Sequence, residues 1–300
     1  MCAVTHVGRP TEVRRIGLVV HPRRKIDDAL SKVEEWSAAH GADVVQIRIA
    51  GQERVVAEAG EVGTCDLVVA LGGDGTTLAA LHAAAPVDRP VLGAALGSLG
   101  ALTTVMAGEL LEALDRVADG TWKARRLPAL SVTSDGAQPH VAINDLVAAR
   151  RSASQVIVSI YLDGEVYARF AGDGLIIATP LGSTAYTLAA GGPVIGPGHV
   201  GYVLTPLAPH GGCVPPLIVG TENRVTIDVA GYFGARIEVD GQALDEQPRT
   251  LGVSWVADYA TLVGLGHDES LFAGLRRRGI LSDSPRVRAQ DERAAAQAGA

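Results

Sequence analysis

The chain has 300 residues, a formal net charge of −7 and 47% apolar residues, of which few are aromatic. This length favours about two domains, and the acidic charge argues against a nucleic-acid or anionic membrane partner. The three cysteines lie far apart without a Cys-x-x-Cys pair, so we expect neither a zinc site nor a disulfide framework. Residues 1–15 lack the apolar segment of a signal peptide, and no apolar run approaches about 18 residues, so we expect a cytoplasmic protein.

The first 120 residues alternate between strand-like and helix-like segments. Strands are expected at 15–21, 43–49, 66–71 and 91–96, and helices at 26–39, 76–84 and 109–118. Strands that alternate with helices form parallel sheets covered on both faces. Residues 1–120 therefore predict an α/β, Rossmann-like nucleotide-binding domain.

Beyond residue 120 the pattern changes to short strands joined by two-residue turns. Strands at 156–162 and 165–170 flank Asp163-Gly164, and a strand at 236–239 precedes Asp240-Gly241. Asp-Gly supplies the positive φ angles that hairpin turns need. Residues 121–267 therefore predict a β-rich, mostly antiparallel domain, with one helix at 183–190.

The C-terminal residues favour a helix and then disorder. A helix with a basic end is expected at 270–278, and we expect the segment 268–280 to close the first domain. Residues 282–300 are mainly Ala, Gln, Arg, Asp and Glu without core residues, which predicts a disordered tail.

The segment Gly72-Gly73-Asp74-Gly75-Thr76 directly follows the strand expected at 66–71. Glycines let a backbone approach a phosphate closely, and the N-terminus of the following helix adds its positive end. Asp74 then lies where a carboxylate can accept the proton of an attacking hydroxyl, as in phosphoryl transfer. The alternative is a tight strand-to-helix turn that Asp74 caps. No Gly-x-x-x-x-Gly-Lys-Ser/Thr loop occurs, which excludes a P-loop enzyme.

A second segment runs from Gly172-Asp173-Gly174 through Thr179-Pro180 to Gly182-Ser183-Thr184-Ala185-Tyr186. It predicts a strand at 174–178, a turn set by proline, and a helix capped by Ser183 or Thr184. Free amides and hydroxyls at a helix start suit an anionic or polar ligand, and Tyr186 is placed to stack on a base. The alternative is an ordinary capped helix.

A basic triplet, Arg23-Arg24-Lys25, follows the first strand at the C-terminal edge of the sheet, where α/β proteins bind ligands. Two interpretations stay open: the triplet contacts donor phosphates, or it is a solvated basic turn.

The two glycine-rich segments together resemble those of the NAD kinase family. Its members share Gly-Gly-Asp-Gly-Thr, an Asn-Glu or Asn-Asp pair, a Gly-Asp-Gly strand followed by Thr-Pro-Thr-Gly-Ser-Thr-Ala-Tyr, and a late Asp-Gly-Gln. Here the pair is Asn144-Asp145 and the late element is Asp240-Gly241-Gln242, in the family's order across residues 15–275. The resemblance implies transfer of a phosphoryl group from ATP or polyphosphate, with Mg²⁺, to the 2′-hydroxyl of the adenosine ribose of NAD, giving NADP.

The resemblance also implies roles for single residues. Asp74 would be the catalytic base, and Gly75 and Thr76, after Gly72 and Gly73, would lie against the substrate phosphates. The residues that would hold ribose hydroxyls or the nicotinamide amide are Asn144, Asp145 and Asp173. The residues that would line the dinucleotide site, in a NAD-binding domain over 121–267, are Thr184, Ala185, Tyr186 and Ala189, with Gln242 nearby. No metal ligand set of the protein's own is implied, and the family is usually a homodimer or homotetramer.

The chain departs from the family pattern at several positions. The family's Asn-x-Gly-x-x-Gly-Phe-Leu element keeps its glycines at 95–102, but Ala95 and Ala101 replace the Asn and Phe. The other replacements of usual family residues are Ala171 for a basic residue, Leu181 for Thr, Ala189 for Ser and Gly211 for Ser. Each removes a polar or stacking group, and a lost hydrogen bond costs about 0.5–1.5 kcal/mol. Two alternatives therefore stay open: a kinase of the same fold for another nucleotide or hydroxyl acceptor, and a non-catalytic NAD(P)-binding sensor.

Overall fold

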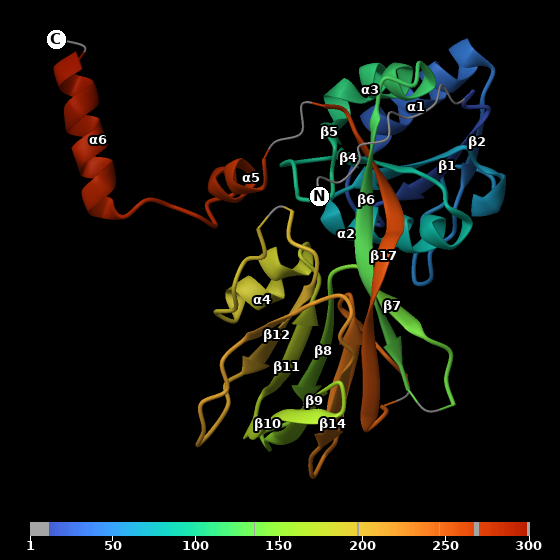
Figure 1. Cartoon of the computed structure of the whole chain (residues 1–300). Coiled ribbons are helices and arrows are strands. Elements are labelled where there is room, and N and C mark those ends of the chain that lie inside the picture. Colours follow the sequence, from blue (N-terminus) through green and yellow to red (C-terminus); the bar gives the residue numbers. More distant parts are fainter. Residues whose placement is uncertain (1–11, 135, 197, 246, 267–269, 299–300) are drawn as a thin grey trace. The chain divides into compact units, whose positions relative to one another are not determined.

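The computed structural model describes residues 12–134, 136–196, 198–245, 247–266 and 270–298 (Figure 1). The chain divides into two compact units, residues 1–266 and residues 267–300, and each is described by itself. Among the described residues, no helix combines the length and apolar character that crossing a membrane requires.

A parallel sheet forms the first part of the larger unit, with the strand order β4-β3-β1-β2. Its strands are β1 (Arg15–Val20), β2 (Asp43–Gln46), β3 (Leu67–Gly72) and β4 (Val91–Ala95), and its helices are α1 (Asp27–His40), α2 (Asp74–Ala84) and α3 (Leu110–Ala118). Successive side chains of β3 enter two different apolar clusters: Leu67 and Leu71 join the one that contains α1 and α3, and Val68 the one that contains α2. Helices thus cover both faces, which confirms the predicted α/β arrangement.

The remaining strands are mostly antiparallel, as predicted. They are β5 (Val105–Met106), β6 (Lys123–Thr133), β7 (His140–Ala142), β8 (Asp145–Arg150), β9 (Val156–Leu162), β10 (Glu165–Gly172), β11 (Gly174–Ala178), β12 (Tyr202–Leu207), β13 (Leu217–Val219), β14 (Val225–Ala230), β15 (Ala235–Val239), β16 (Gln242–Ala243) and β17 (Thr250–Gly264). One antiparallel sheet has the order β13-β12-β11-β8-β15-β16. The strands β10, β9 and β14 join the other sheet through β17.

Strand β17 belongs to both halves of the larger unit. It pairs antiparallel with β14 and β6, while Leu262 near its C-terminal end pairs in parallel with Val91 of β4. Figure 1 shows β6 and β17 side by side between the helix-covered sheet and the β-rich part. Among the described residues one continuous sheet therefore extends through both halves, and the domain boundary near residue 120 remains a prediction.

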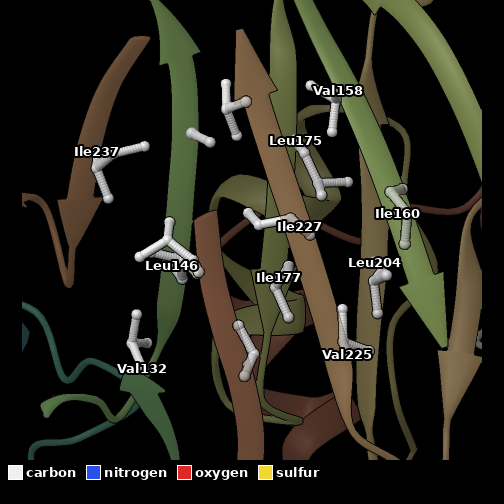
Figure 2. Close-up of a cluster of buried hydrophobic side chains, with 14 of the residues drawn as sticks. Val132, Leu146, Val158, Ile160, Leu175, Ile177, Leu204, Val225, Ile227 and Ile237 are labelled. Carbon is white, nitrogen blue, oxygen red and sulfur yellow. The ribbon is translucent and has the colours of Figure 1, made fainter. Parts of the chain in front are cut away.

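The two sheets pack face to face in the β-rich half, and Figure 2 shows the apolar side chains between them. The labelled side chains are Val132, Leu146, Val158, Ile160, Leu175, Ile177, Leu204, Val225, Ile227 and Ile237. Burial of such side chains is the main stabilising contribution to a core of this kind. It fixes β8 and β11, and with them the polar residues at their ends.

The helix predicted at 183–190 needs correction. The structure has a single 3₁₀ turn over Gly182–Thr184 and then the four-residue helix α4 (Tyr186–Ala189). Neither begins with a side-chain cap: Ser183 Oγ donates to the carbonyl of Pro180 at 2.6 Å, and Thr184 Oγ1 donates to that of Leu181 at 3.0 Å. These hydroxyls bond back to the preceding turn, which competes with capping.

The smaller unit contains α5 (Leu271–Arg277) and α6 (Pro285–Ala298). Helix α5 confirms the helix predicted at 270–278, and Ser270 caps it by accepting the amide of Ala273 at 3.2 Å. Helix α6 replaces the disordered tail expected at 282–300, because its Ala, Arg, Gln and Glu residues are strong helix formers. Residues 267–269 and 299–300 lie outside the described residues, and closure of the first domain by segment 268–280 stays a prediction.

Candidate functional site

The turn at Gly72–Thr76 carries β3 directly into α2. Asp74 is the first residue of α2, two residues earlier than expected, and Gly73 precedes it in extended backbone. A Cβ on Gly72 would lie 2.1 Å from Thr76 Oγ1, so the chain needs glycine there. A Cβ on Gly73 or Gly75 would meet nothing within 4 Å, so this backbone is open on its outer side. Because the first amides of a helix lack partners within it, this opening suits a phosphate.

The loop after β4 holds the side chain of Asp74. Oδ2 accepts the amide hydrogen of Ala101 and Oδ1 accepts that of Leu102, both at 2.9 Å. A Cβ on Gly100 would lie 2.0 Å from Oδ1, so the carboxylate rests directly on this glycine. Each oxygen keeps a further lone pair. Asp74 is therefore held in one orientation and can still accept a hydrogen bond from a hydroxyl.

A cavity of about 340 Å³ lies over the N-terminus of α2. Its walls are Gly73–Thr76, the residues His21, Pro22 and Arg24 after β1, and Gln52. The cavity is thus lined by the start of a helix, an arginine and an aspartate, and its volume has room for several phosphate groups. Arginine and helix N-termini are the groups that proteins use most to bind phosphate.

The wall that carries Arg24 is itself held in place. Arg54 donates to the carbonyl of Arg24 at 2.5 Å and to that of His21 at 3.3 Å. His21 Nδ1 accepts the amides of Arg23 and Arg24 at 3.1 Å each. Burial, and then the neighbouring arginines, lower the pKa of His21, which favours the neutral ring that accepts these bonds.

Asn144 precedes β8 and Asp145 begins it, and Asp240 fixes the backbone of both. Asp240 Oδ1 accepts the amides of Asn144 at 2.7 Å and Asp145 at 3.0 Å, and Oδ2 accepts that of Ile143 at 2.8 Å. Asp240 has a φ of 49°, a left-handed conformation that Asp tolerates, and its side chain is 2% exposed. The predicted Asp-Gly turn is confirmed, and its carboxylate also organises the Asn-Asp pair.

The carboxyl group of Asp145 is buried beside two other acids. Burial raises its pKa to about 7, and the charges of Asp240 and Glu238 add to the rise. A group that changes charge near neutral pH, within a cluster of polar residues, is typical of a functional site.

The second glycine-rich segment packs against the Asn-Asp pair. Thr179 donates its amide to the carbonyl of Asn144 at 2.9 Å and its hydroxyl to that of Ile143 at 2.7 Å. A Cβ on Gly182 would lie 2.1 Å from the carbonyl oxygen of Asn144. Thr184 is buried, whereas Ala185, Tyr186 and Ala189 are exposed beyond this contact. The structure thus brings this segment to the pair and leaves the Tyr186 ring accessible.

A larger cavity of about 840 Å³ lies beside α2 and shares Gly75 with the smaller one. Its other lining residues include Leu78, Ala79 and His82 of α2, Tyr259 of β17, Arg48, Asp240 and Gln242. This volume is within the range of small-molecule sites, and the mixture of apolar walls and a few polar groups is typical of them. Gln242 and Gly75, the residue after Asp74, therefore line the same cavity.

Asp173 lies elsewhere. It precedes β11 and forms an ion pair with Arg150 at the end of β8, with 2.8 Å between Nε and Oδ1. In the antiparallel pair of β8 and β11, Gly174 lies opposite Ala149 and Ala178 lies opposite Asp145. Asp173 is therefore roughly 16 Å from the Asn-Asp pair, at about 3.3 Å per residue. Within one copy of the chain the structure does not bring it beside that pair.

Both halves of the larger unit match known family models. Residues 23–122 match the ATP-NAD kinase N-terminal domain, and residues 143–252 match the ATP-NAD kinase C-terminal domain. The chain belongs to the ATP-NAD kinase family. It is 34% identical to NAD kinase 1 of Streptomyces avermitilis, over 91% of this chain and 89% of that protein. It is also 32% identical to the NAD kinase of Clostridium perfringens, over 77% of this chain and 85% of that protein.

Two solved kinase structures share the fold of this chain. Yeast NADH kinase complexed with NADH matches with a TM-score of 0.74 and 22% identity, covering 91% of this chain and 89% of that one. The NAD kinase of Archaeoglobus fulgidus in complex with ATP matches with a TM-score of 0.70 and 24% identity, covering 87% of this chain and 98% of that one. These likenesses agree with a parallel α/β part followed by a β-rich part.

One residue of this candidate site, His82, was missed by the motifs of the sequence. His82 lies 2.6 Å from Asp240, a partner 158 positions away, so no local pattern signals it. Asp240 was found through the Asp-Gly turn and the family's Asp-Gly-Gln element, but neither signal indicated that its carboxylate holds the amides of the Asn-Asp pair.

Proposed function

We propose that this protein is an NAD kinase that transfers the γ-phosphoryl group of ATP to the 2′-hydroxyl of the adenosine ribose of NAD. A bond forms between that oxygen and the γ-phosphorus, the bond from the γ-phosphorus to the departing ADP oxygen breaks, and Asp74 receives the hydroxyl proton. NADP and ADP are the products. The observation that carries the proposal is the fixed carboxylate of Asp74 at the N-terminus of α2, in a chain of this family.

The chain's own residues supply positioning and charge. Asp74 keeps one orientation through the amides of Ala101 and Leu102, so it can meet the hydroxyl without rearrangement. Gly75, Thr76 and Arg24 line the smaller cavity, where donor phosphates would lie against the amides at the start of α2 and the guanidinium. These donors would stabilise the negative charge on the phosphoryl group during transfer.

Mg²⁺ would enter with the nucleotide. Among the described residues that line the smaller cavity, Asp74 is the carboxylate, and no group of three or more potential ligand residues occurs in the described part of the chain. Mg²⁺ keeps several waters and is held largely by substrate phosphates, so this lining fits an ion that arrives on the nucleotide, with Asp74 beside it as the base. The bound ion would neutralise charge on the phosphate oxygens.

The acceptor would lie on the side of the Asn-Asp pair. Asn144, Asp145 and Gln242 offer hydrogen bonds to ribose and amide groups, and the accessible ring of Tyr186 offers a stacking surface. The larger cavity opens from Gly75 and has room for a nucleoside, so a nucleotide can extend from α2 into it. A role for Asp173 in this site stays part of the proposal.

We also propose a cytoplasmic homodimer or homotetramer. The thiols of Cys65 and Cys213 are free, which suits a reducing compartment. Tyr232 is 90% exposed and stands beside the exposed ring of Phe233, and large exposed aromatic residues are enriched where proteins meet partners.

The decisive experiment is a direct assay. Purified protein, ATP, Mg²⁺ and NAD should give NADP and ADP in equal amounts, measured by chromatography. Parallel reactions with polyphosphate as donor, and with NADH or other nucleosides as acceptors, define the substrates. Absence of NADP with both donors would contradict the proposal, and product from another acceptor alone would favour the alternative kinase.

A further inference from the structure

One carboxylate joins α2 to the Asn-Asp pair. Asp240 Oδ2 accepts the amide of Ile143 and also lies 2.6 Å from His82 Nε2, in the last turn of α2. A carboxylate oxygen only accepts, so His82 Nε2 carries the hydrogen and donates it. Hydrogen bonds to an ionised group are the stronger kind, and this one is shielded because the Asp240 side chain is 2% exposed.

The same helix carries the base at its other end. Asp74 begins α2 and His82 lies eight residues later, about 12 Å along the axis at 1.5 Å per residue. A helix of this length moves as one body, and its packing against β3 and β4 buries Ala80, Leu81 and Ala84. The position of Asp74 relative to Asn144 and Asp145 therefore depends in part on the contact between His82 and Asp240.

We propose that His82 is a positioning residue for phosphoryl transfer. It acts through Asp240: by holding that carboxylate, it keeps the amides of Ile143, Asn144 and Asp145 ordered and in register with Asp74. The expected effect of His82 on kcat rests on the proposed kinase activity. The expected ordering of the three amides does not depend on that activity.

The test compares His82→Ala with His82→Gln, which keeps a neutral N–H donor at a similar reach. The control is His199→Ala, which removes an exposed histidine in the loop before β12, outside both cavities. The measurements are kcat and KM for NAD and ATP, thermal melting, and hydrogen exchange of the peptide that covers residues 143–145.

For His82→Ala we expect kcat to fall about 10- to 100-fold, since a displacement of about 1 Å can cost that much. Both KM values should stay within about threefold, and the peptide over 143–145 should exchange faster. His82→Gln should restore kcat to within about threefold of wild type and restore slow exchange.

Three results would overturn the inference. One is a kcat of His82→Ala within twofold of wild type. Another is a loss of rate in His82→Gln equal to that in His82→Ala. The third is a raised KM for one nucleotide with unchanged exchange, which would make His82 a ligand contact in the larger cavity. If wild-type protein makes no NADP, the proposed function fails by itself, and the exchange comparison still decides whether His82 orders the three amides.

Discussion

Gly100 lies directly beneath the carboxylate of Asp74, so that a β-carbon on the glycine would come within 2.0 Å of Oδ1. The same loop donates the amides of Ala101 and Leu102 to the two oxygens. Base and loop are therefore one structural unit. Because the loop acts through its backbone, the alanine at position 101 leaves this hold on Asp74 intact.

Gly100→Ala should displace the base. The new methyl group collides with Oδ1, which is part of a held side chain, so Asp74 must shift and lose one or both amide bonds. We expect kcat to fall by about 100-fold, because a displacement of a catalytic group by about 1 Å can cost that much. The affinity for ATP should stay nearly unchanged. Steady-state kinetics and calorimetric ATP titration measure this. Gly108→Ala is the matched control, since a Cβ there meets nothing within 4 Å. Full activity in Gly100→Ala would show that the loop tolerates a shifted carboxylate.

Asp74→Asn removes the base while keeping the shape of the side chain. The asparagine side chain has a single accepting oxygen, so one of the two loop amides loses its hydrogen-bond acceptor. The free energy of unfolding should therefore drop by about 1 kcal/mol. Turnover should fall about 10²- to 10⁴-fold, the usual contribution of a positioned base. NAD and ATP binding, measured by titration, should survive. Substantial NADP formation by this variant would mean that another group accepts the proton.

The sequence predicts the single strands and turns of this fold better than it predicts which strands pair with one another. Alternating apolar segments over 15–96 indicate the parallel sheet, and Asp163-Gly164 indicates a hairpin, because both signals are local. The pairing of Leu262 with Val91 links residues far apart in the chain, and no local pattern encodes it. In the tail two local signals oppose each other: the lack of core residues indicates disorder, whereas the helix propensity of its alanines favours the helix α6 that the structure has.

In the candidate site, too, the sequence predicts what depends on neighbouring residues and misses what depends on distant ones. Asp74 and its glycines follow from the strand before them, and the Asn-Asp pair follows from the family motif. Asp173 matched its motif equally well, but its distance from Asp145 depends on how β8 and β11 are paired. The link between His82 and Asp240 requires two halves of the chain to meet, which sequence spacing cannot show.

Arg24→Ala should weaken donor binding. Arg24 lines the smaller cavity with the open amides of α2, so its loss removes a charge-assisted contact of about 1.5–3 kcal/mol. We expect KM for ATP to rise about 10- to 100-fold, with KM for NAD changed far less. The neighbouring Arg23→Ala is the control, since Arg23 is exposed and does not line that cavity. If both variants raise the KM for ATP equally, the arginines act through their general positive charge and not through a direct phosphate contact. Raised salt would then reduce the effect of both variants equally.

The buried carboxyl of Asp145 should make stability depend on pH. Burial raises its pKa to about 7, with Asp240 and Glu238 adding to the rise, whereas the unfolded chain has about 3.9. Between about pH 4 and 7 the folded protein holds a proton that the unfolded chain has released. The contribution to stability is therefore complete below pH 4 and is lost as the pH rises through 7.

Asp145→Asn removes this dependence because the amide does not titrate. From pH 5 to pH 8 the free energy of unfolding of the variant should rise relative to wild type by on the order of 2 kcal/mol. Urea denaturation at pH 5, 6, 7 and 8 measures it, with Asp43→Asn as the control because Asp43 is exposed at the start of β2. A difference between Asp145→Asn and wild type that stays constant over this range would show that Asp145 is already charged in the folded protein at pH 5, and that water or a cation reaches it there.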